Sequence, residues 1–261
     1  MQDKETREYL PERYLTSFTE KYNLYQQRYA DEPREGDKVL IQLVKDAVLP
    51  RLEGGEEVTV LDIGCSTGNL LYHLKRAVPA LNLIGGDLAS SAIEECKADP
   101  RLQGIDFKVM DILDLPSNRF DIVISNAATY FFGHEQYALA VASIGRSLRP
   151  NGRWFSYEFM HPYEQDLHIV EKSRNHPDGL SLYFRSYSFV RRVLAEHGFG
   201  PPEFRPFKIP IDLARNESQT ETAVGYEDMN SYTVKAESGE RMLFRGTLFQ
   251  PWCHLNVAKS R

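Results

Sequence analysis

Short apolar stretches alternate with stretches of helical periodicity between residues 58 and 159. The apolar stretches are rich in β-branched and aromatic residues, which favour buried strands. They read VTVLDI (58–63), LNLIGGD (81–87), FKVMD (107–111), FDIVISN (120–126) and RWFSYEF (153–159). Strands that alternate with helices in this way are typical of repeated βαβ units, so we expect an α/β fold built on a mainly parallel sheet.

Two of the intervening stretches carry apolar residues at helical spacing. The stretch 70–78 places its leucines on one helix face, and Pro79 ends this helix. The stretch 135–148 also has apolar residues on one helix face. The residues expected to face the core are Leu139, Ala142, Ile144 and Leu148. Both predicted helices lie between predicted strands, as βαβ units require.

The segments on either side of this block are expected to complete one domain. Residues 1–50 read as two helices that form an N-terminal cap, with an aromatic cluster of Tyr14, Phe18, Tyr22, Tyr25 and Tyr29. After the core (51–160), the remainder (161–261) is expected to begin with a polar and aromatic loop (161–185) and a helix (186–197). A C-terminal β-rich elaboration follows, with extended stretches at 204–210, 231–236 and 241–249 and a hairpin turn at 237–240.

The composition favours a cytoplasmic protein that binds neither nucleic acid nor membrane. The net charge is −6 and the pI is near 5.7, whereas a nucleic-acid site needs clustered Lys and Arg. No apolar stretch approaches the ~20 residues of a membrane span, and the N-terminal MQDKETREYLPERY is too polar for a signal peptide. Cys65, Cys96 and Cys253 lie far apart without a C-x-x-C spacing, which predicts buried free thiols and no metal site.

The most distinctive local feature is VLDIGCSTGN (60–69), a predicted strand that runs into a turn of small residues. Gly64 allows backbone angles and a close approach that a side chain would block. A dinucleotide-binding turn would carry glycine at the places of Ser66 and Asn69. Asp62, just before the turn, would also repel a pyrophosphate, and it suits a ligand with an ammonium group.

Polar residues also end the next predicted strands. Asp87 ends the second strand, where a carboxylate can accept hydrogen bonds from both ribose hydroxyls of a nucleoside. Asp111 ends the third strand, where it can accept from the exocyclic amine of adenine while Leu88 and Ile112 flank the ring. Asn126 ends the fourth strand, beside the expected reacting centre. Ligands of open α/β sheets bind outside the carboxyl ends of the strands, so we expect these side chains to line one crevice.

The order of these motifs resembles that of a known enzyme family. The series VLDIGCSTG, GGDL, VMDI, FDIVISN and LRPNG, between Val58 and Phe159, is similar to the motif series of Rossmann-like, S-adenosylmethionine-dependent methyltransferases. The resemblance implies a Rossmann-like, seven-stranded, mainly parallel sheet with helices on both faces. It also implies S-adenosylmethionine as cofactor, bound by Asp62, Gly64, Cys65, Ser66, Gly68, Asn69, Asp87, Leu88, Asp111, Ile112, Asn126 and Ala127. Ser66 departs from the family pattern, which commonly has a third glycine in the turn.

The reaction of this family is an in-line displacement in which a nucleophile of the acceptor attacks the methyl group of the donor. The resemblance therefore implies an enzyme that methylates an oxygen or nitrogen of a small molecule, of the sugar or secondary-metabolite type. A hydroxyl acceptor benefits from a general base. The predicted catalytic residues are His161, Tyr130 and His134, and Glu158 and Tyr163 are further candidates for the base. His161 is preferred because it follows the fifth strand and because imidazole titrates near neutral pH.

Other functions are compatible with the same residues. A module that binds the donor and regulates a partner without turnover would keep the same pocket. A protein or RNA methyltransferase, or a nicotinamide-dependent oxidoreductase, would share the fold class. Metal-ligating side chains occur at His161, Glu164, Asp166, His168 and His176, but their spacing matches no compact ligand motif. The sequence leaves homodimer formation open.

Overall fold

The computed structural model describes residues 26–172, 179–208, 231–235, 239, 241–245 and 250–260. The chain divides into two units, Met1–Phe207 with Pro251–Arg261, and Lys208–Gln250. The first half of the predicted N-terminal cap lies outside the described residues, and with it Tyr14, Phe18, Tyr22 and Tyr25. The division of the chain predicted from the sequence, at residues 50 and 160, stays a prediction.

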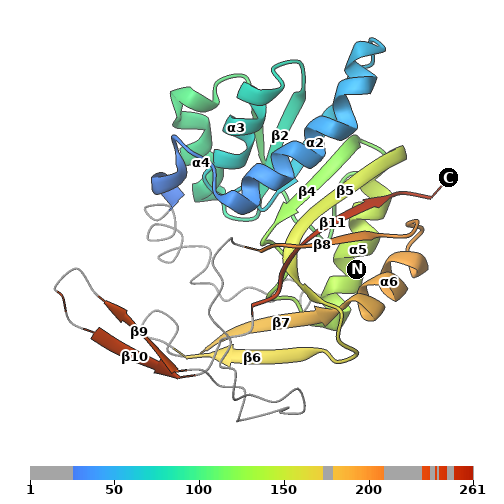
Figure 1. Cartoon of the computed structure of the whole chain (residues 1–261). Helices are drawn as coiled ribbons and strands as arrows, with labels where there is room; N and C mark the ends of the chain where they lie inside the picture. The colour runs from blue at the N-terminus through green and yellow to red at the C-terminus, as the bar shows by residue number, and fades with distance from the viewer. Residues whose placement is uncertain are drawn as a thin grey trace. The chain divides into compact units, whose positions relative to one another are not determined.

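The larger unit is built on a nine-stranded sheet (Figure 1). Its main path runs β3 (Asp106–Val109), β2 (Asn82–Asp87), β1 (Thr59–Ile63), β4 (Phe120–Asn126), β5 (Leu148–His161), β11 (Trp252–Ala258) and β8 (Glu203–Pro206). The first five of these strands are parallel, whereas β11 is antiparallel to both β5 and β8. The strands predicted between residues 58 and 159 correspond to β1 to β5, so the α/β class and the mainly parallel path of seven strands are confirmed.

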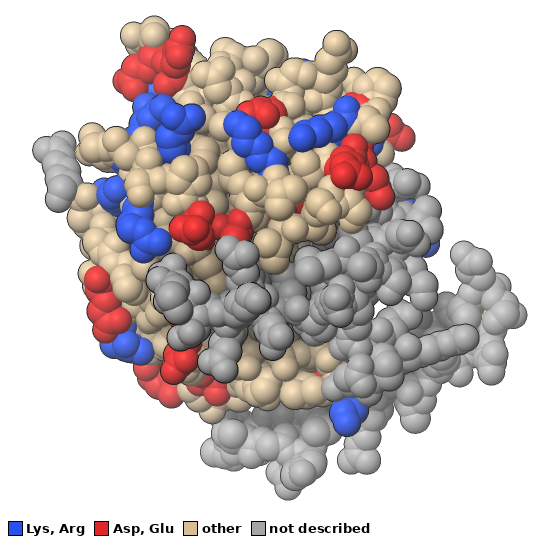
Figure 2. Space-filling view, turned by 180° about the vertical axis from the view of Figure 1, so that it is seen from behind, with Lys and Arg blue, Asp and Glu red and all other residues tan. Residues whose placement is uncertain are grey.

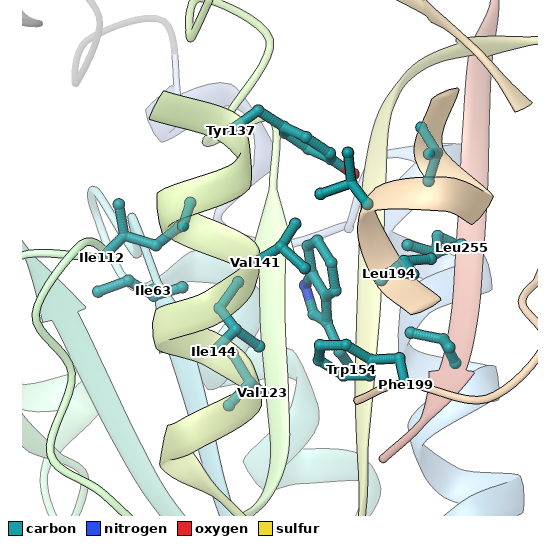
Figure 3. Packing of buried hydrophobic residues seen from close by; sticks show 14 of the residues in the cluster. Ile63, Ile112, Val123, Tyr137, Val141, Ile144, Trp154, Leu194, Phe199 and Leu255 are labelled. Carbon is teal, nitrogen blue, oxygen red and sulfur yellow. The ribbon is translucent and has the colours of Figure 1, made fainter. Parts of the chain in front are cut away.

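Helices cover both faces of this sheet, and in the described residues none is both long and apolar enough to span a membrane. They are α2 (Glu35–Glu53), α3 (Asn69–Ala77), α4 (Ser90–Ala98), α5 (His134–Ser147) and α6 (Tyr187–Glu196), with the short 3-10 helices η3 (Gln27–Tyr29) and η4 (Pro100–Leu102). One apolar cluster joins α2 and α3 to the sheet and includes Leu71 and Phe155. The other joins α5 and α6 to the opposite face, where Val141 and Leu194 pack around Trp154 (Figure 3). Trp154 and Phe155 are neighbours in β5, so their side chains point to opposite faces, as the two clusters require.

Helix α5 buries a face that only partly matches the prediction, since Ile144 and Leu148 are buried as expected. Leu139 is 46% exposed and Ala142 is partly exposed, so the prediction for these two residues is wrong. Tyr137, Val141 and Ile144 are buried, at spacings of four and three residues that place them on one side of the helix. The aromatic Tyr137, which the predicted pattern omitted, belongs to this face.

The segment 161–185 contains a strand pair where the sequence predicted a loop. Strand β6 (Leu167–Glu171) runs antiparallel to β7 (Leu180–Ser186), and β7 pairs in parallel with the end of β5. Leu182 and Phe184 alternate along β7 and are buried beside Phe159. The prediction was wrong because strands of five and seven residues among polar neighbours leave only a weak apolar pattern.

The chain after β7 follows the prediction more closely. Helix α6 corresponds to the helix predicted at 186–197, and the Ser186 side chain caps it by accepting a hydrogen bond from the backbone N–H of Phe189. Strand β8 overlaps the first predicted extended stretch. In the smaller unit, β9 (Ser231–Lys235) and β10 (Arg241–Arg245) pair antiparallel, as the predicted hairpin requires.

Candidate functional site

The turn after β1 lies where the carboxyl ends of β2, β1 and β4 meet at one edge of the sheet. The backbone N–H groups of Gly64 and Cys65 both donate to the carbonyl oxygen of Gly86, at 2.7 and 3.0 Å. Gly64 has a φ of +80°, and a Cβ atom at this position would lie 2.9 Å from the Cβ of Ala128. Glycine is therefore needed here twice, for the backbone angle and for the close approach of the loop after β4. Gly68, with a φ of +71°, leads from the turn into α3.

Asp87 ends β2 and is held against this turn. Its two carboxylate oxygens accept hydrogen bonds from the backbone N–H groups of Ser66 and Ala89, both at 2.9 Å. Ser66 has a left-handed backbone conformation, with a φ of +46°. Burial raises the pKa of Asp87. Each carboxylate oxygen has a second lone-pair site, so the group can accept hydrogen bonds from a ligand as well.

Asp62 is a buried carboxyl group near the end of β1. Its side chain is 2% exposed, and Oδ1 has no hydrogen-bond partner among the described residues. Burial, followed by the negative charges of Asp37 and Asp87, raises the pKa of Asp62 to about 8. Buried polar atoms in proteins are nearly always hydrogen-bonded. This oxygen is therefore suited to accept a hydrogen bond from a cationic group of a ligand.

The start of α2 brings Asp37 into the site, a residue that the sequence did not indicate. Its buried carboxylate pairs with Arg34 at 2.9 Å and accepts a hydrogen bond from the Asn126 side-chain amide at 2.8 Å. An acidic residue in the first turn of a helix is common because it complements the helix dipole. Its contact with β4, 89 positions away, left no local pattern in the sequence.

The loop after β4 supplies the residues predicted for the reacting centre. The Oδ1 atom of Asn126 is buried and has no hydrogen-bond partner in the described part of the chain. Ala127 has a φ of +56° and donates its N–H to the carbonyl oxygen of Tyr157 at 2.9 Å. Through Ala128, which faces Gly64, this loop adjoins the turn after β1. The structure therefore brings the ends of β1, β2 and β4 together as predicted, although a ligand role for each residue stays a prediction.

The predicted adenine side lies after β3. Asp111 is partly exposed, and its carboxylate accepts a hydrogen bond from the backbone N–H of Leu113 at 2.9 Å. Leu88 is also partly exposed. Ile112, in contrast, is buried in the core near Ile63 (Figure 3). Asp111 and Leu88 therefore offer surface to a ligand, whereas Ile112 offers little.

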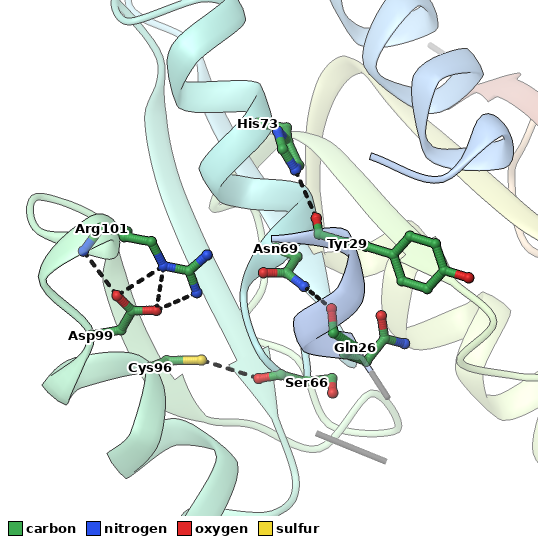
Figure 4. Close-up of polar contacts among 8 residues, drawn as sticks. All are labelled: Gln26, Tyr29, Ser66, Asn69, His73, Cys96, Asp99 and Arg101. Carbon is green, nitrogen blue, oxygen red and sulfur yellow. Dashed lines mark hydrogen bonds and ion pairs between the residues drawn. The ribbon is translucent and has the colours of Figure 1, made fainter. Parts of the chain in front are cut away.

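Cys65 and Asn69, also predicted to contact the donor, have structural partners. Cys65 packs in the apolar core, and it is a buried free thiol like Cys96 and Cys253, as predicted. The side-chain amide of Asn69 donates to the carbonyl oxygen of Gln26 at 2.8 Å (Figure 4). This bond fastens the chain before α2 to the start of α3, so Asn69 has a structural role independent of any ligand.

The predicted catalytic residues occupy different surroundings. His161 ends β5 and is 1% exposed, and its burial lowers its pKa. Tyr130 packs against the rings of Phe159 and Trp252, with centroid distances of 5.5 and 6.3 Å. His134 begins α5 and is half exposed on the surface. Of the three, only the imidazole of His161 is enclosed by the protein.

His134 lines a surface hollow of about 320 Å³. Its ring pairs with the carboxylate of Asp166 at 3.3 Å. His168 and Tyr183 line the same hollow, with their rings stacked 4.3 Å apart. Among the described His, Cys, Asp and Glu residues, no three are placed to hold a metal ion, and His176 lies outside the described residues.

Two buried charges lie behind the loop after β4. Glu158 on β5 is buried, which raises its pKa to about 7, although the charge of Arg185 opposes this shift. Arg185 on β7 is fully buried. Glu158 lay among the residues considered from the sequence. Arg185 was missed because its strand was predicted to be a loop.

Comparisons with known proteins find similarity to methyltransferases. Residues 60–152 match a family model described as a methyltransferase domain. The phthiotriol/phenolphthiotriol dimycocerosates methyltransferase of Mycobacterium tuberculosis is 32% identical over 111 residues, which make up 42% of this chain and 39% of that protein. The malonyl-[acyl-carrier protein] O-methyltransferase of Bacillus cereus is 25% identical over 166 residues, or 62% of this chain and 60% of that protein. The chain thus spans about two fifths to three fifths of the length of these relatives.

A solved structure extends the similarity of the fold to almost the whole chain. The 1,6-didemethyltoxoflavin-N1-methyltransferase of Burkholderia thailandensis, with bound 1,6-didemethyltoxoflavin and S-adenosylhomocysteine, matches with a TM-score of 0.56. The alignment covers 97% of this chain and 91% of that one, at 15% identity. At this identity the match supports the architecture and leaves the chemistry to the residues of the site.

Proposed function

We propose that this chain, whose residues 60–152 match a methyltransferase domain, is a Rossmann-like, S-adenosylmethionine-dependent methyltransferase that methylates an oxygen or nitrogen atom of a small-molecule acceptor. The acceptor class that we favour is a sugar or a secondary metabolite. One observation carries the proposal: the buried carboxyl group of Asp62 has an acceptor atom without a partner in the described residues, and it lies within the electrostatic reach of Asp87.

The residues at this edge of the sheet fit S-adenosylmethionine. The vacant acceptor of Asp62 suits its ammonium group, and the remaining lone-pair sites of Asp87 suit its ribose hydroxyls. Gly64 lets the loop after β4, which carries Ala127 and Ala128, approach the turn closely. The residues available for the adenine and methionine ends are Asp111, Leu88, Asn126 and Ala127. When bound, the donor supplies a methyl group that its sulfonium sulfur has already activated.

Because the methyl group is already activated, the protein contributes alignment and exclusion of water rather than covalent catalysis. The donor-binding residues stand at the ends of strands, which keeps their positions rigid. Burial lowers the pKa of His161, so its imidazole is neutral near pH 7. A ring nitrogen of His161 can then accept the proton of an acceptor hydroxyl. Tyr130 and His134 are the alternative proton acceptors.

The distribution of charge supports a small molecule rather than a nucleic acid as acceptor. The chain carries a net charge of −6. On the face shown in Figure 2, the basic side chains of the described residues lie among acidic ones and form no continuous basic field. Binding of a polyanion depends on such a field.

Calorimetric titration with S-adenosylmethionine and S-adenosylhomocysteine tests the donor site, with NAD as the comparison ligand. We expect heat of binding from both adenosyl compounds and none from NAD. No heat from either adenosyl compound overturns the proposal, and stabilisation by NAD instead favours a nicotinamide-dependent enzyme.

Turnover of methyl-labelled donor tests the acceptor class. The panel contains sugars, secondary metabolites, RNA, and malonyl-acyl-carrier protein, because one relative is named for the last of these. Label on an oxygen or nitrogen of a small molecule supports the proposal. Label only on RNA or protein contradicts it, and binding without transfer to any acceptor favours a regulatory module.

A further inference from the structure

We infer that Glu158 and Arg185 are positioning residues, which hold the backbone of the loop 127–133 against the donor site. This loop joins β4 to α5 and carries Ala127 and Ala128. The functional consequence, that a loosened loop weakens donor binding, rests on the proposed function. Neither side chain needs to touch the donor for this role.

Glu158 holds the loop from β5. Its side chain is 2% exposed, and Oε1 accepts hydrogen bonds from the backbone N–H groups of both Ala128 and Thr129 at 2.9 Å. Hydrogen bonds to an ionised carboxylate are roughly twice as strong as neutral ones. Glu158 thereby fixes two consecutive peptide groups of the loop.

Arg185 holds the same loop from β7. Its side chain is completely buried, and Nη2 donates to the carbonyl oxygens of Thr129 at 3.0 Å and Phe132 at 2.5 Å. The guanidinium also lies over the ring of Tyr137 in α5, 4.1 Å from its centroid. In the described residues, the side-chain hydrogen bonds of Arg185 therefore go to the loop backbone.

A contribution to stability alone accounts poorly for two buried charges. Removal of each ion from water costs several kcal/mol, and apolar residues of similar volume often stabilise a fold as well as a buried ion pair does. The effect of the two side chains is local to the loop. Thr129 is bound at its N–H by Glu158 and at its carbonyl by Arg185, so it is held from two strands.

The loop in turn forms a wall of the donor site. Ala127 has a φ of +56°, and such a conformation persists only where the surroundings enforce it. Ala128 sits so close to Gly64 that a Cβ atom there would lie 2.9 Å away. Displacement of the loop would therefore reshape the glycine turn. The apparent affinity for a ligand falls in proportion to the fraction of molecules that keep the competent conformation.

Amide NMR of the ligand-free protein tests the contacts directly. Burial raises the pKa of Glu158 to about 7, and the other charged or titratable groups that act on it are Arg185 of β7 and Tyr137 of α5. We expect the amide resonances of Ala128 and Thr129 to titrate near this pH, because protonation weakens their acceptor. In Glu158→Gln these titrations disappear.

The Thr59 amide is the internal control for this titration. It donates to the carboxylate of Asp121 at 2.9 Å, at the opposite end of β4. The pKa of Asp121 lies below its ordinary value, since hydrogen bonds and the charges of Arg51 and Arg149 outweigh the effect of burial. The Thr59 resonance is therefore expected to stay constant where those of the loop move.

Calorimetry with S-adenosylhomocysteine tests the consequence for the donor site. We expect Glu158→Ala to weaken binding about tenfold, the ratio that follows if about a tenth of the molecules keep the loop in place. Glu158→Gln retains an acceptor and recovers most of this loss, and Arg185→Met behaves like Glu158→Ala. The matched control is Asp121→Asn, which neutralises a buried carboxylate far from the carboxyl ends of the strands and leaves the affinity unchanged.

The positioning role is wrong if the Ala128 and Thr129 amides do not titrate with Glu158, or if folded Glu158→Ala binds the probe as the unmodified protein does. If Glu158→Ala fails to fold, Arg185→Met and Arg185→Lys carry the affinity comparison, and weakened binding is again the expected result. Lysine keeps the charge of Arg185 but not the planar donor group. If the unmodified protein gives no heat with S-adenosylhomocysteine, the proposed function fails, while the amide titration still decides the positioning role.

Discussion

The backbone N–H of Ser66 donates a hydrogen bond of 2.9 Å to the carboxylate of Asp87, which ties the turn after β1 to the end of β2. The second oxygen of Asp87 accepts from Ala89 at the same distance. One side chain thus shapes the turn and starts the chain toward α4. Its remaining lone pairs are the acceptors that we assign to the ribose hydroxyls of the donor.

Asp87→Ala removes both the hydrogen bonds that shape the turn and the acceptors assigned to the ribose hydroxyls. We expect a loss of about 3 kcal/mol in binding of S-adenosylhomocysteine, roughly a hundredfold in affinity, since hydrogen bonds to a charged group contribute about 1.5–3 kcal/mol each. Calorimetry provides the measurement. Asp99→Ala is the control, because that carboxylate also accepts a backbone N–H, from Arg101, but lies outside the strand ends. Unchanged affinity in Asp87→Ala would refute the ribose assignment.

Alanine substitutions at Gly64 and Gly55 distinguish the cost of backbone strain from the cost of a steric conflict. Both have a φ of +80°, but a Cβ atom meets nothing within 4 Å at Gly55 and the Cβ of Ala128 at Gly64. Gly55→Ala is expected to cost about 1–2 kcal/mol for the left-handed conformation alone, and Gly64→Ala about 1–3 kcal/mol more. Urea denaturation measures both values. Ala128→Gly, combined with Gly64→Ala, is expected to restore part of the additional stability lost at Gly64. Equal costs of Gly64→Ala and Gly55→Ala would show that the close approach of Ala128 does not matter.

Much of the fold was predictable because its signals are local. The strands β1 to β5 are short apolar stretches, and the turn at Gly64 follows directly from one of them. The pair β6 and β7 was missed because alternation over so few residues resembles an irregular loop. The face of α5 was misjudged because Tyr137, which is amphipathic, was not counted as a core residue.

The parts of the site that escaped prediction depend on contacts between distant residues. Asp37 reaches Asn126 across 89 positions, and Arg185 reaches Thr129 and Phe132 across more than 50. No local pattern records such pairs. The predicted residues Asp62 and Asp87, in contrast, could be found because each stands at the end of a recognisable strand.

The raised pKa of Asp62 predicts how the free energy of unfolding changes with pH. Its pKa is raised from an ordinary value of 3.8 to about 8 in the folded protein. Between these values the folded state holds a proton that the unfolded chain has lost, so the free energy of unfolding falls as pH rises, by at most about 1.4 kcal/mol per pH unit. The fall ends above pH 8. Asp62→Asn cannot bind this proton, and urea denaturation from pH 5 to 9 is expected to show a shallower decline. Parallel curves for the two proteins would contradict the raised pKa.

His161 predicts a pH profile for methyl transfer to a hydroxyl acceptor. Burial lowers the pKa of His161 below its ordinary value of 6.5. We therefore expect kcat to rise with pH through a pKa below 6.5 and to stay constant at higher pH. His161→Ala is expected to reduce kcat by about 10² to 10⁴, the usual contribution of a general base, and to remove this limb of the profile. Binding of S-adenosylhomocysteine stays unchanged, because the donor contacts lie on other strands. His197→Ala, at the end of α6, is the control for removal of an imidazole. Full turnover in His161→Ala would exclude it as the base, and the same assay on Tyr130→Phe and His134→Ala would then decide between the remaining two.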